Sequence, residues 1–142
     1  NSFRGALFEA NHNFKASGGN NFSLSLYVGS GSFPYTTAST VYSATDEVSS
    51  GGGSNYAVKV LTRLGVVSST AVASVDFDNV TWSSATFSAA YAAIYNTDTV
   101  DGTANRLVVV LDFGGSKTAT NGDFTITFPD PTTASNAIIS MS

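Results

Sequence analysis

The chain has 142 residues, of which 42% are hydrophobic and 11% are charged, and its 6 basic and 10 acidic side chains give a net charge of −4. This length predicts a single domain over residues 1–142 with one hydrophobic core. The acidic balance and the scattered Lys and Arg residues argue against nucleic acid as a partner, since a phosphate backbone needs several basic side chains on one surface. No cysteine is present, which excludes disulfides and thiol chemistry. No apolar run approaches the roughly 18–20 residues of a membrane span.

Residues 1–14 are expected to form a short helical arm. Hydrophobic side chains recur there at the spacing of one helix face, at Phe3, Ala6, Leu7 and Ala10. A helix this short is marginal alone, so we expect it to dock on one end of a sheet. His12 is the only histidine. Its expected place near the helix C-terminus favours a positive charge on the imidazole.

The next segments predict one strand and one long loop. Phe22 to Val28 alternates apolar and small polar residues, which indicates a half-buried strand. Residues 29–56 lose this period and are rich in Gly, Ser and Thr; a loop of this length inside a domain is usually functional or flexible. Phe33, Tyr35 and Tyr42 are its candidate partner-binding residues, for a glycan or a protein. The same rings are equally suited to pinning the loop onto the core.

Two further strands follow. Tyr56 to Val67 is predicted to be a strand. Alternate residues in it face away from the side of Lys59 and Arg63, and a bulge or turn is expected at Gly65. The residues on that alternate side are Val58, Val60, Thr62 and Leu64. The alternation near residue 75 predicts a strand with a buried face, formed by Ala73, Val75 and Phe77, and a solvent-exposed face, formed by Ser74, Asp76 and Asp78.

Trp82, the only tryptophan, is predicted to pack in the core with its N–H bonded. The aspartates next to it in sequence also raise the question of a glycosidase. Asp76 and Asp78, with Asp112 elsewhere, are the carboxylates that such chemistry would have to pair. The alternation favours solvated strand residues instead.

Ala85 to Phe128 is the expected centre of the domain. It holds three apolar runs separated by two loops dense in Asn, Asp, Gly and Thr, the second with a turn signal at Asn121–Gly122. The first two runs are apolar on both faces, so their second side needs a cover, either the N-terminal helix or a neighbouring subunit. A final run, Ala137 to Met141, is expected to close the sheet. The predicted fold is all-β, a mainly antiparallel β-sandwich of about 7–8 strands with one short N-terminal helix.

Candidate chemical sites are weak. Asn96, Asp98 and Asp101 in NTDTVDG offer oxygen ligands for calcium, but their spacing does not match an EF-hand and such residues dominate ordinary turns. No GxSxG motif accompanies His12, and the GGSKT segment lacks the frame of a phosphate-binding loop. We therefore predict no catalytic residue, no metal and no cofactor, and hence no enzyme.

Five segments carry a family resemblance that covers nearly the whole chain. In order they are ALFEANHNF, LSLYVGS, TVYSATDEVSSGGG, VDFDNVTWSSATFSAAYAAIYN and NRLVVVLDFGGSKTATNGDFTITFPDPTTASNAIISM. Together they resemble a family of small virion structural proteins of tailed double-stranded DNA bacteriophages.

The resemblance implies a non-enzymatic particle component. The first expectation is a capsid decoration (cement) protein on the outer surface of the virion, which binds the major capsid protein as a homo-oligomer, in the simplest case a trimer. The alternatives are a tail or head-fibre component, or a module that binds host-surface glycans. Low charge and doubly apolar central strands agree with a protein that other subunits cover.

Overall fold

A computed structural model describes residues 2–29, 33–68, 72–129 and 137–141 of the chain. Over these residues it is mostly antiparallel β-structure with one short helix at the N-terminus. The elements are α1 (Ser2–Phe8), β1 (Phe22–Tyr27), β2 (Lys59–Leu61), β3 (Arg63–Ser68), β4 (Ala73–Phe77), β5 (Val80–Asn96), β6 (Arg106–Ile126) and β7 (Ile139–Met141). The prediction of an all-β fold with an N-terminal helix is confirmed.

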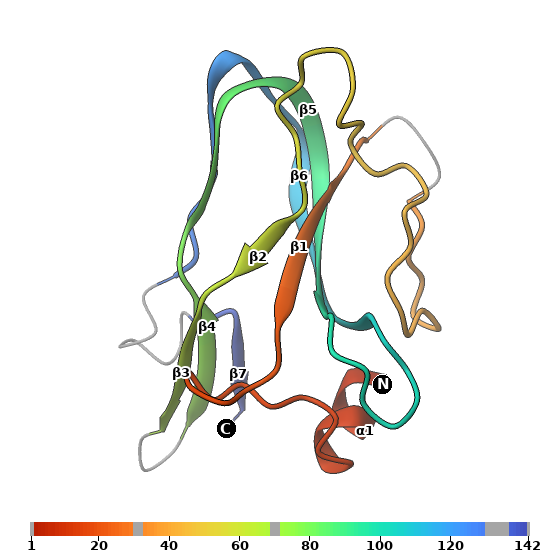
Figure 1. Cartoon of the computed structure of the whole chain (residues 1–142), viewed down its shortest axis with the longest axis vertical. Helices are drawn as coiled ribbons and strands as arrows, with labels where there is room; N and C mark the ends of the chain where they lie inside the picture. Colours follow the sequence, from red (N-terminus) through yellow and green to blue (C-terminus); the bar gives the residue numbers. More distant parts are fainter. Residues whose placement is uncertain (1, 30–32, 69–71, 130–136, 142) are drawn as a thin grey trace.

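The strands form two sheets (Figure 1). The larger sheet has the order β2-β1-β5-β6, and the smaller has the order β3-β4-β7. All neighbouring strands within them are antiparallel. β7 pairs with β4 at the outer side of the smaller sheet, in the part of the chain predicted to close the sheet.

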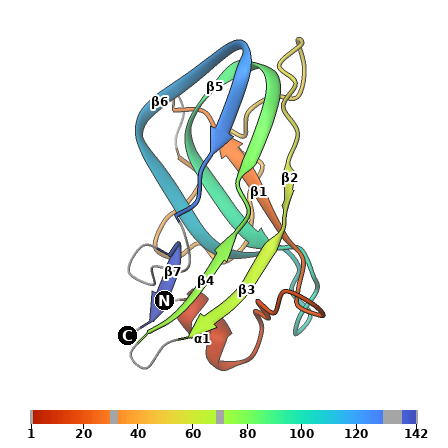
Figure 2. The same ribbon diagram turned by 90° about the vertical axis from the view of Figure 1, so that its left-hand side faces the viewer.

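A long hairpin of β5 and β6 dominates the larger sheet. In both views the ribbon of these two strands rises on one side of the molecule, bends over the top and descends on the other (Figures 1 and 2). Register shifts accompany the bend, including one between Ala89 and Tyr91. A bulge of this kind bends a strand and increases its twist. The hairpin therefore supplies both layers of a sandwich-like fold.

The structure corrects the prediction of a second loop in the central stretch. Residues 114–122 belong to β6, which runs without interruption from Arg106 to Ile126. Asn121 does adopt a left-handed φ of 49°, but it lies beside a bulge opposite Ala85 rather than in a hairpin turn. Asn and Gly suit both features, because each needs a backbone that other residues adopt at a cost.

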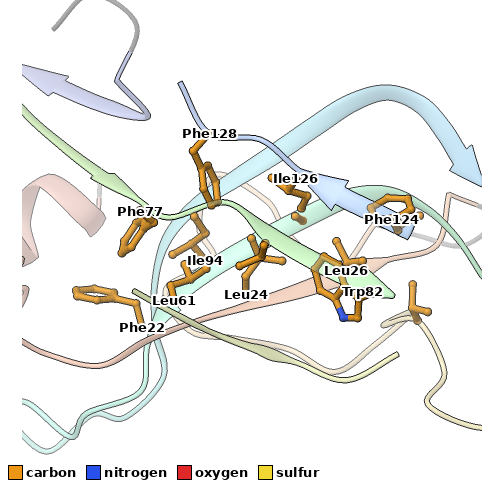
Figure 3. Close-up of a cluster of buried hydrophobic side chains, with 14 of the residues drawn as sticks. Phe22, Leu24, Leu26, Leu61, Phe77, Trp82, Ile94, Phe124, Ile126 and Phe128 are labelled. Carbon is orange, nitrogen blue, oxygen red and sulfur yellow. The ribbon is translucent and has the colours of Figure 1, made fainter. Parts of the chain in front are cut away.

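The core lies between the two layers that the bent β5–β6 hairpin forms (Figure 3). Leu24, Leu26 and Ile94 on one side meet residues of the returning part of β6, such as Phe124 and Ile126. Burial of these side chains supplies the main stabilisation, at about 1.5–3 kcal/mol for each large apolar residue.

Trp82 is part of this core and is 1% exposed. Its Nε1 donates to the carbonyl oxygen of Ala57 at 2.7 Å. The prediction of a buried Trp82 with a bonded N–H is confirmed.

The N-terminal arm docks on the same core. Phe3 and Leu7 of α1 pack against it, whereas Phe8, the last residue of the helix, is 93% exposed. No helix among the described residues is long and apolar enough to cross a membrane.

Candidate functional site

The 33–48 segment lies against the outer face of the larger sheet, on the side away from the smaller sheet (Figure 1). Hydrogen bonds hold it at two places. Val48 donates its backbone N–H to Leu26 at 2.9 Å, and Leu107 donates to Thr40 at 2.8 Å. The segment thus spans the sheet from β1 to β6.

The three predicted partner-binding aromatics all contact this face. The Phe33 ring lies 4.3 Å from that of Tyr91, and the Tyr42 ring stacks at 4.5 Å on Tyr95. Tyr35 is buried. Of the two roles considered for these rings, the packing corresponds to pinning the segment onto the sheet.

Tyr35 is held through its hydroxyl as well as its ring. Its hydroxyl lies 2.7 Å from that of Tyr27 and accepts the backbone N–H of Ser43 at 3.0 Å. Burial raises the pKa of both tyrosines, so the two hydroxyls stay protonated at neutral pH. The doubly apolar strands predicted from sequence therefore receive cover from the chain itself. Neither the N-terminal helix nor a second subunit is needed over this part of the face.

Glu47 connects this cover to the core. Tyr56 donates its hydroxyl to Glu47 Oε1 at 2.7 Å, and Tyr42 donates to the other carboxylate oxygen. Desolvation and these bonds raise the pKa of both tyrosines. The Tyr56 hydroxyl also accepts the Leu26 backbone N–H at 3.0 Å. The arrangement orders a long segment and contains no nucleophile with a lowered pKa.

The candidate calcium residues have separate protein partners. Asn96 is buried and donates its amide to the Asn11 carbonyl oxygen at 3.0 Å. Asp98 accepts from the side chains of Asn20 and Asn21, both at 3.0 Å, and these bonds lower its pKa. Asp101 is exposed and lies 3.9 Å from Arg106. Over the described ranges, no three His, Cys, Asp or Glu side chains gather at one point.

The prediction of a positively charged His12 at a helix end is wrong. α1 ends at Phe8, and the His12 ring is 7% exposed among aromatic rings that include Phe3, 5.3 Å away. Burial and the nearby Arg106 charge lower its pKa to about 4, so the imidazole is neutral. Asn96 approaches His12 Nδ1 at 3.2 Å. His12 Nε2 is buried and has no hydrogen-bond partner in the described part of the chain.

The prediction that Asp76 is solvated is also wrong. Its side chain is fully buried, and one carboxylate oxygen accepts the N–H of Phe77 at 2.8 Å. Gly65, which pairs with Asp76 across the sheet, lies against Ala16, from the segment between α1 and β1. The alternation had indicated a wet face because it does not reveal such a cover. Asp78 is exposed, as expected.

Residues 58–66 carry a surface that the sequence did not indicate. The alternation predicted there is present, but its apolar side faces outward. Val60 is 74% exposed and Val66 is 55% exposed, whereas Leu61 and Gly65 are buried. We call Val58, Val60, Leu64 and Val66 the apolar stripe.

The basic residues of this strand point the other way. Lys59 Nζ lies 5.5 Å from the centre of the Trp82 ring. Arg63 Nε donates to the carbonyl oxygen of Lys15 at 2.9 Å, and the same guanidinium also bonds the Asn20 carbonyl. β2 and β3 run end to end along one side of the molecule (Figure 2), each at the outer edge of its sheet. The predicted bulge at Gly65 is confirmed, with a register shift after Arg63 and a φ of +90°.

An apolar cleft of about 710 Å³ opens beside β6. Leu111 and Phe113 line it from the first arm of the bent strand, and Phe124 and Ile126 line it from the second arm. Lys117 and Asp123 supply one positive and one negative charge to its lining. The cleft is a consequence of the bend in β6, which no periodicity in the sequence reveals.

Comparison with known proteins found no relative: no model of a protein family, no curated protein and no solved structure matches this chain. The class of the protein is therefore set by its fold alone, a sandwich-like, mainly antiparallel all-β domain.

Proposed function

We propose that this chain is a non-enzymatic structural protein of a bacteriophage virion. Its role is that of a capsid decoration (cement) protein on the outer shell, where it stabilises contacts between major capsid subunits. The sequence resemblance supplies the particle and the partner. The inverted strand at residues 58–66 is the observation that supports a role in assembly.

A strand with aliphatic residues on alternate positions ordinarily turns them inward, because burial of each is worth about 1.5–3 kcal/mol. Here four of them form the apolar stripe on the outside, while Lys59 and Arg63 face the protein. Exposed aliphatic side chains gathered along the edge of a sheet favour a protein contact. A cement protein repeats such a contact many times over a shell, so modest affinities act together.

The groups with acid–base chemistry support the non-enzymatic part of the proposal. His12 is neutral and lies among aromatic rings. Asp76 is fully buried in β4, and Asp98 is occupied by asparagine amides. The glycan-binding alternative draws less support from the fold, because Tyr35 is buried and the rings of Phe33 and Tyr42 lie against tyrosines of the sheet.

Imaging of intact virions that carry this protein tests the proposal. We expect its density on the icosahedral shell, in contact with the major capsid protein. Density on the tail alone would contradict the decoration role and favour the tail component. A binding assay with undecorated capsids adds a test of the surface: Val60→Lys should weaken binding at least tenfold, since it places a charge in the apolar stripe on which assembly depends. Phe8→Lys is the matched control, because Phe8 is exposed outside the stripe.

A further inference from the structure

Two unusual surfaces of this protein lie along outer strands of its sheets. In the order β2-β1-β5-β6, the strand that begins the apolar stripe is one outer strand, and the strand that lines the cleft is the other. β1 and β5 lie between these two strands, and Leu64 and Val66 of the stripe belong to β3, at the outer edge of the smaller sheet.

The stripe has the form of an edge strand that another chain can cover. β2 pairs with β1 and β3 pairs with β4, and over the described residues neither has a strand on its other side. The nine residues from Val58 to Val66 span about 30 Å when extended, at 3.3 Å per residue. An unpaired edge with alternate exposed aliphatic residues is a template for pairing, and proteins that avoid association place charges on the outside of such strands. Here the charges of Lys59 and Arg63 face inward.

The cleft has the complementary form. β6 pairs with β5 along one side; on its other side, among the described residues, an isolated bridge joins Arg106 to Val41. The cleft beside the remaining edge is lined by aromatic and aliphatic side chains and falls within the volume range of binding pockets, about 300–1,000 Å³. Its Lys117 and Asp123 have opposite charges, so these two residues give the lining no net charge.

We propose that a second copy of this chain occupies the cleft, with the 58–66 strand of one copy lying along β6 of the next and the apolar stripe turned into the cleft. This contact deepens the proposed function, since it presupposes a protein that assembles. Both surfaces are present on every copy, and one carries exposed aliphatic side chains where the other is an apolar cleft. The contact is head-to-tail, so repeating it forms a closed ring, such as the trimer proposed for a decoration protein, or an open filament.

Single-cysteine variants test this contact, because the chain has no cysteine of its own. Val60→Cys and Val66→Cys mark the stripe, and Leu111→Cys and Phe113→Cys mark the cleft. Each stripe variant is mixed with each cleft variant under mild oxidation, after circular dichroism has shown that each is folded. Phe8→Cys replaces the stripe variant in the control mixtures. The use of two positions on each side allows for the narrow geometry of a disulfide.

We expect stripe–cleft heterodimers to form on the order of a hundredfold faster in at least one mixture than in the Phe8→Cys control, since docked thiols react at a millimolar effective concentration. Val60→Cys and Val66→Cys alone should cross-link no faster than the control. Rapid formation of stripe–stripe dimers would indicate a symmetric dimer and would overturn the head-to-tail contact. It would leave the proposed structural role in place. Folded variants that cross-link in no mixture above the control would also overturn the head-to-tail contact. Particle imaging decides the proposed function independently of either result.

Discussion

Lys59 and Trp82 form a contact across the larger sheet in which an ammonium group lies 5.5 Å above the centre of a buried indole. A lysine at an outer strand ordinarily points its charge into water. Here it covers the core tryptophan, and its strand neighbour Val60 is left outside. The same inversion recurs at Arg63, so the orientation of the whole 58–66 strand is a property of the fold.

Arg63 holds that orientation and is the first test of it. Arg63→Lys should lower the free energy of unfolding by about 1–3 kcal/mol, since a lysine cannot bond several carbonyl groups of the 15–20 turn at once. Chemical denaturation measures the loss. Equal stability of the Arg63→Lys protein and the wild type would show that the guanidinium does not hold the strand.

The hydroxyl of Tyr35 is expected to hold the 33–48 segment on the sheet. Tyr35→Phe removes a buried hydroxyl that contacts Tyr27 and accepts the N–H of Ser43. We expect a loss of about 1–2 kcal/mol in global stability. Amide hydrogen exchange should also become faster in residues 40–48.

Tyr91→Phe is the matched control for that change, since Tyr91 lies on the same face and its ring contact with Phe33 survives. Unchanged exchange rates in the Tyr35→Phe protein would mean that ring packing alone holds the segment.

Stability should depend on pH through His12. Its folded pKa of about 4 lies below the ordinary 6.5, so the folded state disfavours the proton. The stability contributed by the neutral ring is complete above pH 6.5 and is lost as the pH falls from 6.5 towards 4. The difference corresponds to roughly 3 kcal/mol. Denaturation curves at several pH values measure it.

His12→Phe is the informative comparison, because it keeps an aromatic ring among Phe3, Phe14 and Phe22 and removes the titration. The difference in stability between variant and wild type should change in favour of the variant below pH 6.5. Parallel pH profiles for the two proteins would show that His12 does not titrate on unfolding in this range.

The sequence predicted the kind of each element better than the direction in which it faces. Alternation over Tyr56 to Val67 correctly indicated extended structure, which the fold divides into β2 and β3 of two different sheets. A period of two, however, does not say which side meets the core. The burial of Trp82 was predicted correctly, because so large an apolar ring is stabilised mainly by burial in a core. The burial of Asp76 was not, because a period of two does not show that both faces of a strand are covered; Ala16, far away in the sequence, lies against Gly65, the residue that pairs with Asp76.

The candidate surfaces could not be predicted from local sequence patterns. The cleft exists because β6 bends back over itself, and residues 114–122 have the composition of a loop. The apolar faces of β5 and β6 did indicate that something covers them. The cover includes the aromatic 33–48 segment of the same chain, which sequence reasoning had treated as a candidate partner surface.

The apolar stripe is the surface on which the assembly role depends, and sedimentation of the free protein over a concentration series tests it most directly. Val60→Lys and Phe8→Lys both remove an exposed hydrophobic side chain, and neither position is in the core. The account predicts that wild type and Phe8→Lys associate as concentration rises and that Val60→Lys stays monomeric. Association of Val60→Lys equal to that of the wild type would contradict it.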